Sequence, residues 1–177
     1  MGVRFSIDRR ERLVSYVVEG GATQTEAHAF FDAVLAAPDY RCGFDFLGDR
    51  RGAGAESDPS YVYAVAAEVL AHAAVLGPCR WAVVVADDDA HRRALTWAAL
   101  AAPSGVEIRP FRTADEAAGW LGLPGGYAPA ARHVAPPLPV PVVPPAVAGV
   151  THDGQGVTRA EEHLALVACS AGSEAVR

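Results

Sequence analysis

The most constraining feature of the sequence is the run from Trp81 to Ala86, which is six apolar residues followed at once by the acidic triplet 87–89. This run is too short to cross a membrane and too uniformly apolar for a half-exposed strand. It therefore predicts an inner strand of a parallel sheet, covered by helices on both faces. The next residues, from Asp87 to Ala101, have the periodicity of a helix. Strand, acidic turn and helix form half of a βαβ unit, and the rest of the chain should supply the other halves.

The remaining elements follow from apolar spacing and from helix start and stop signals, among them two capping boxes with the pattern Thr-x-x-Glu. The expected strands are residues 3–7, 13–18, 44–47, 81–86 and 106–109. The expected helices lie between Thr23 and Pro38, from Asp58 to Leu76, from Asp87 to Ala101 and from Thr113 to Leu121. The first two strands are close enough to form a β-hairpin, whose first strand should be an antiparallel edge. Right-handed crossovers then predict an α/β fold: a single, mostly parallel five-stranded sheet with helices on both faces.

The chain divides by composition into two parts. Residues 1–124 form the expected α/β domain, and residues 125–177 form a Pro-rich tail. Seven of the thirteen prolines of the 177-residue chain lie between Pro129 and Pro145. Such a segment favours a polyproline-II spacer, and we expect the tail to be mostly disordered.

Charge and composition exclude several classes of function. The formal net charge is −6, and no basic stripe is present to neutralise phosphates, so we expect no nucleic-acid partner. The chain contains no lysine, which excludes chemistry that needs a lysine amine. The first residues lack the apolar core of a signal peptide, and no stretch is apolar enough for a membrane span. These features predict a cytoplasmic protein.

Ligands of parallel sheets bind beyond the carboxyl ends of the strands, where residues 20–23, 48–57, 87–92 and 112–113 should meet. Arg50 and Arg51 lie between glycines there and could hold an anion, although a solvated loop is the simpler interpretation. The acidic residues 87–89 could bind Mg²⁺, but capping of the following helix is favoured. No histidine or cysteine spacing is typical of a metal site, and we expect neither a metal nor a cofactor.

Three segments resemble a known family: Phe44-Asp45-Phe46, the strand from Trp81 to Ala86, and the run from Val106 to Arg112 that leads into Asp115–Leu121. Over residues 1–124 the chain resembles the STAS-like proteins, which are related to anti-sigma-factor antagonists and to the cytoplasmic domain of sulfate transporters. The resemblance implies a small binding and regulatory module without catalytic activity. Antagonist members of the family are phosphorylated on a serine in an Asp-Ser-Ser-Gly-like turn after the third strand. That motif is absent here, although Ser57 and Ser60 lie near the place.

The sequence therefore predicts a module that recognises a partner protein, or a small anionic or lipid ligand, at the carboxyl edge of the sheet. The candidate ligand-binding residues are Arg50, Arg51, Asp87, His91 and Arg112. One alternative is a switch phosphorylated on Ser57 or Ser60. Another is an enzyme that uses Asp45, Asp87 and His91. A homodimer is an open possibility.

Overall fold

The computed structural model describes residues 2–21, 23–54, 60–125 and 127. The strands are β1 (Gly2–Asp8), β2 (Leu13–Glu19), β3 (Asp45–Asp49), β4 (Arg80–Val84) and β5 (Glu107–Phe111). The helices are α1 (Gln24–Ala36), α2 (Ser60–Ala71), α3 (Ala73–Leu76), α4 (Asp88–Ala101), the 3₁₀ turn η1 (Ala102–Ser104) and α5 (Ala114–Leu121). The predicted helix start at Asp58 and Pro59 lies outside the described residues, as do residues 128–177 of the predicted tail.

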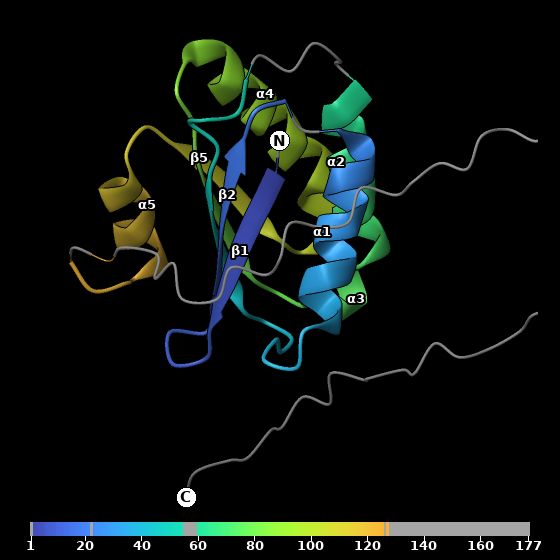
Figure 1. Cartoon of the computed structure of the whole chain (residues 1–177), viewed down its shortest axis with the longest axis vertical. Coiled ribbons are helices and arrows are strands. Elements are labelled where there is room, and N and C mark those ends of the chain that lie inside the picture. The colour runs from blue at the N-terminus through green and yellow to red at the C-terminus, as the bar shows by residue number, and fades with distance from the viewer. Residues whose placement is uncertain (1, 22, 55–59, 126, 128–177) are drawn as a thin grey trace, which may run out of the picture.

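The five strands form one sheet in the order β1-β2-β3-β4-β5. The β1–β2 pair is antiparallel and the other three pairs are parallel, which confirms the predicted hairpin and the mostly parallel sheet. Successive parallel strands are added in one direction, so right-handed crossovers place their helices on the same face. Figure 1 shows α1, α2 and α3 on one side of the sheet and α5 on the other.

Strand β4 is buried on both faces, as the apolar run predicts. Trp81 and Val83 belong to the larger core, beneath α1, α2 and α4. Ala82 and Val84 belong to the smaller core, beneath α5. All four side chains are at most 1% exposed. An uninterrupted apolar sequence is needed because neither face of this strand meets water.

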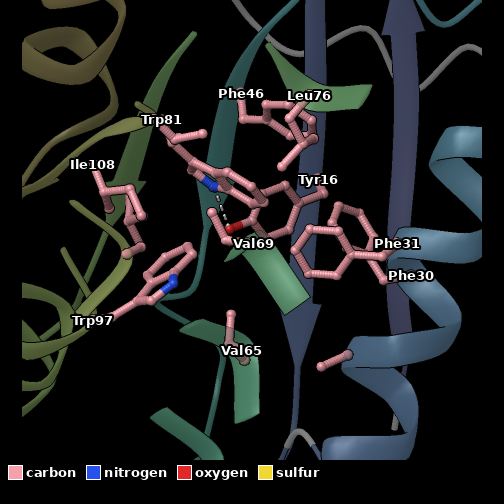
Figure 2. Close-up of a cluster of buried hydrophobic side chains, with 14 of the residues drawn as sticks. Tyr16, Phe30, Phe31, Phe46, Val65, Val69, Leu76, Trp81, Trp97 and Ile108 are labelled. Carbon is pink, nitrogen blue, oxygen red and sulfur yellow. Dashed lines mark hydrogen bonds between the residues drawn. The ribbon is translucent and has the colours of Figure 1, made fainter. Parts of the chain in front are cut away.

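Trp81 is at the centre of the larger core (Figure 2). Its ring stacks on Phe46 at a centroid distance of 4.2 Å, and its indole N–H donates to the hydroxyl of Tyr16 at 3.0 Å. The Tyr16 ring lies directly against Gly48 of β3. A Cβ placed on Gly48 would be 2.2 Å from Cζ of Tyr16, so any side chain at this position would force the Tyr16 ring to move.

Several elements differ from the prediction: β3 extends to Asp49, beyond the expected end at residue 47, and β4 ends at Val84, before the expected end at residue 86. The expected helix from Asp58 to Leu76 is divided at His72, whose backbone (φ −101°, ψ 10°) separates α2 from α3. Strand β5 continues through Pro110 to Phe111, beyond the expected end at residue 109. Proline is tolerated there because β5 is an edge strand, where a missing N–H can face away from the neighbouring strand. In the described part of the chain, no helix has the length and apolar character needed to cross a bilayer.

Candidate functional site

A pocket of about 150 Å³ opens at the carboxyl end of the sheet, between α2 and α4 and next to the end of β4. Its walls are apolar and come from both helices and from the strand: Val62, Val65, Val83, Val85, Ala94 and Trp97. Polar side chains complete the lining: Arg50, Tyr61, Asp87, Asp89 and Arg93. The position agrees with the general rule for ligand sites in α/β sheets.

Asp87 determines where α4 begins at the edge of this pocket. Its carboxylate accepts a hydrogen bond from the backbone N–H of Ala90 at 2.8 Å, which makes it the N-cap of the helix. The interpretation of the acidic triplet as a capping segment is therefore confirmed for Asp87. The same arrangement places the positive end of the α4 dipole beside the pocket.

Arg50 is held in place from two directions. Its backbone N–H donates to the carbonyl of Val84 at 2.9 Å, which fixes the loop after β3 to the end of β4. Its guanidinium donates to the hydroxyl of Tyr61 at 3.1 Å and lies over the Tyr61 ring, 5.2 Å from the centroid. These contacts fix the orientation of the Arg50 guanidinium at the edge of the pocket.

Tyr16 connects this region to the core beneath it. Burial raises the pKa of Tyr16 to about 12, although the nearby charge of Arg50 and the hydrogen bond from Trp81 both lower it. Tyr16 is therefore a neutral phenol at physiological pH. It accepts the Trp81 hydrogen bond and is not available as a base.

The other predicted ligand-binding residues lie at the same edge of the sheet but do not line the pocket. Arg51 forms an ion pair with Asp49 at 2.6 Å, and this hydrogen bond lowers the pKa of the Asp49 carboxyl. Arg112 forms an ion pair with Asp88 on α4. The Nδ1 atom of His91 is buried and has no hydrogen-bond partner among the described residues. Of the five predicted residues, the pocket brings together Arg50 and Asp87.

The predicted enzyme site is wrong in its geometry. Asp45 is the first residue of β3 and forms an ion pair at 2.6 Å with Arg80, the first residue of β4. Both residues are at the amino ends of parallel strands, whereas Asp87 and His91 follow the carboxyl end of β4. Asp45 therefore lies at the opposite end of the sheet from the other two residues. Within the described residues, no group of three or more potential ligands is arranged to hold a metal ion.

The arrangement shows a structural role for Asp45. The Arg80 guanidinium also donates to the backbone carbonyls of Trp120 and Leu121, at 2.9 and 2.8 Å. These carbonyls are in the last turn of α5, where a cation is favourable. Asp45 and Arg80 thus attach α5 to the amino ends of β3 and β4.

Of the two candidate phosphorylation sites, Ser60 is exposed at the first position of α2. Ser57 lies outside the described residues.

Tyr61, Arg93 and Trp97 line the pocket but were not predicted as site residues. Val62 and Val65 belong to the apolar stripe predicted for this helix, and Trp97 was interpreted as a core residue. A stripe of this kind shows which side chains face inward, but not whether they fill the space between the helices.

No known protein-family model matches the chain, and no curated protein matches its sequence. Among solved structures, the chain is similar to an uncharacterized protein of the DUF3478 family with a SpoIIAA-like fold from Shewanella loihica PV-4. The identity is 14%, the alignment covers 68% of this chain and 94% of that chain, and the TM-score is 0.49. The architecture that the apolar spacing and turn signals predict, a β-hairpin followed by alternating helices and parallel strands, is the one observed.

Proposed function

We propose that the protein is a non-catalytic regulatory module that binds a small molecule in the pocket between α2 and α4. The observation that carries this proposal is the composition of the pocket, in which apolar walls meet a few fixed polar groups. Pockets of this kind are typical of small-molecule sites. The acidic residues at the pocket already have structural roles, since Asp87 caps α4 and Asp89 pairs with Arg92. These structural roles of the two carboxylates support ligand binding without catalysis.

The proposal is tested by filling the pocket in the full-length chain. Val65→Phe places a ring among the apolar walls, and Leu70→Phe introduces the same residue at a 41% exposed position of the same helix. We expect ligand-observed NMR to detect toluene binding to the wild type and to Leu70→Phe, but not to Val65→Phe. Native mass spectrometry of the freshly purified chain should show any retained small molecule with the same dependence. Equal behaviour of the wild type and Val65→Phe in both measurements would contradict the proposal.

A second candidate is a phosphorylation switch at Ser60. The supporting observation is that Ser60 is exposed and starts α2, where a phosphate would face a helix N-terminus. The test is labelling of the protein by a kinase-containing extract of the source cells, with Ser60→Ala as the control. Labelling that is unchanged in the variant would rule this candidate out. Under either proposal, the partner that binds the ligand-bound or phosphorylated protein is a regulatory protein or a second copy of the chain. Sedimentation with and without ligand would detect the resulting complex.

A further inference from the structure

We infer that the outward face of α2 and α3 is a docking surface for a second copy of the chain, which packs antiparallel to the first about a two-fold axis. This face is on the other side of α2 from Val62 and Val65, which line the pocket, so the inference does not depend on the proposed function. Three observations carry it: the position of the exposed apolar side chains, the distribution of charge around them, and the order of large and small residues along the helix.

The exposed apolar side chains gather on neighbouring helices. Four of the described residues are both large and apolar and exposed: Tyr63 and Leu70 on α2, Val75 on α3 and Leu95 on α4. Tyr63 is 61% exposed, and the exposed Ala67 lies between it and Leu70 on the same face of the helix. A helix whose inward and outward faces are both apolar is normally buried. The outward face of α2 therefore has the character of a surface that another molecule covers.

Charge is confined to the rim of this face. Glu68 is the only acidic or basic residue between positions 60 and 76, and its carboxylate contacts His28 of α1 at 2.9 Å. On the other flank, Asp89 and Arg92 of α4 form an ion pair with each other. A partner selected by charge would find no charge to bind at the centre of the face. Two copies of this chain, each with a net charge of −6, can meet there without direct repulsion.

The order of large and small residues makes the face complementary to itself. Tyr63, Ala67 and Leu70 are spaced by four and then three residues, as core positions are where two helices pack together. A two-fold axis that crosses the helix near Ala67 reverses this order in the second copy. Leu70 of one copy then lies beside Ala67 of the other, and Tyr63 lies near the exposed Ala71 of the other. Each bulky side chain meets a small one, as an interface between identical surfaces requires.

The size of the face indicates how tightly two copies associate. Residues 60–76 span about 25 Å of helix, and neighbouring helices pack about 8–10 Å apart. A strip that covers α2, α3 and the adjacent halves of α1 and α4 is therefore about 20 Å wide, or about 500 Å² per copy. The total of about 1,000 Å² is at the lower limit of a specific interface, so we expect a reversible dimer.

Sedimentation velocity of the full-length chain between about 2 and 200 µM tests the inference, and we expect a shift from monomer to dimer within this range. Ala67→Glu and Ala67→Arg each place two like charges beside the two-fold axis, so each should weaken dimerisation by at least about tenfold. An equimolar mixture of the two variants should dimerise again at the same total concentration, because opposite charges then meet across the axis.

Gly119→Glu provides the matched control. Gly119 is exposed on α5, on the opposite side of the sheet from α2 (Figure 1), so the substitution makes the same change in net charge away from the face. Gly119→Glu should dimerise as the wild type does. Ala67 is itself exposed, so both of its variants should fold, and thermal melts of all the proteins check this.

The other outcomes count against the inference. A wild type that is still monomeric at about 200 µM would overturn it and leave the face to a different protein or to another segment of this chain. A dimer that both Ala67 variants leave intact would show that the contact is elsewhere on the surface. Ala67→Glu and Ala67→Arg that stay monomeric when mixed would refute the two-fold arrangement. None of these results would affect the proposed small-molecule site, because toluene binding tests that site separately.

Discussion

The contact between Gly48 and Tyr16 leads to a quantitative prediction about stability. Gly48→Ala adds one methyl group, whose carbon would be 2.2 Å from Cζ and 2.3 Å from the hydroxyl oxygen of Tyr16. Tyr16 is 5% exposed, so its ring has no solvent-filled space to move into. The ring must shift, and the hydrogen bond that it accepts from Trp81 must lengthen or break.

The expected cost combines two effects. Overpacking a filled core costs about 1–3 kcal/mol. A buried N–H of Trp81 that loses its acceptor adds about 1–3 kcal/mol. Gly48→Ala should therefore lower the free energy of unfolding by about 2–6 kcal/mol, a large part of the 5–15 kcal/mol of an ordinary domain. The same substitution at Gly119 of α5, where no atom lies within 4 Å, should be stabilising by about 0.5–1 kcal/mol.

Urea unfolding followed by tryptophan fluorescence measures both changes. A second background separates the clash from other effects of the added methyl group: in Tyr16→Leu the ring is gone, and Gly48→Ala should cost at least about 1 kcal/mol less there than in the wild type. A cost below about 1 kcal/mol for Gly48→Ala in the wild type would refute the packing argument. Equal costs in the two backgrounds would show that Tyr16 is not the residue that restricts this position.

Two further predictions concern polar contacts. Arg80→Met removes the partner of Asp45 and the donor to the last carbonyls of α5. The urea midpoint should fall by an amount equivalent to about 1–2 kcal/mol, a value reduced because the Arg80 side chain is 41% exposed. An unchanged midpoint would contradict the role of this pair. The hydrogen bond between His28 and Glu68 raises the pKa of His28, so the stability it contributes should be fully present below the ordinary histidine pKa of about 6.5 and lost as the pH rises through the raised value. Urea midpoints between pH 5 and pH 8 should show this loss in the wild type and a smaller one in His28→Gln; identical pH dependence in the two proteins would disprove it.

Local signals in the sequence were sufficient for most of the fold. The capping boxes at Thr23 and Thr113 form as predicted, each with its glutamate three residues later closing the reciprocal hydrogen bond. The apolar run from Trp81 predicted a doubly buried strand because its residues 81–85 are buried, whereas Ala86 is exposed after the strand has ended. The extension of β5 through Pro110 was missed because a proline is compatible with a strand only at an edge, and local sequence does not show which strands are edges.

The site was predicted less completely, for a different physical reason. The carboxyl edge of the sheet is specified by topology, so the sequence could indicate that Arg50 and Asp87 lie there, and both line the pocket. The pocket itself depends on how closely α2 and α4 pack, which is a property of both helices together and of no single pattern. The adjacent Arg50 and Arg51 have the same side chain, yet one faces Tyr61 and the other Asp49. No feature of the loop sequence distinguishes them.

The sequential strand order has a consequence for biosynthesis. Each strand pairs with the one that left the ribosome just before it, so the sheet can grow at one margin as the chain emerges. No strand has to insert between two partners that have already joined. Among the described residues, all those that line the pocket precede β5 in the chain, so a nascent chain that has been synthesised to the end of α4 already contains them.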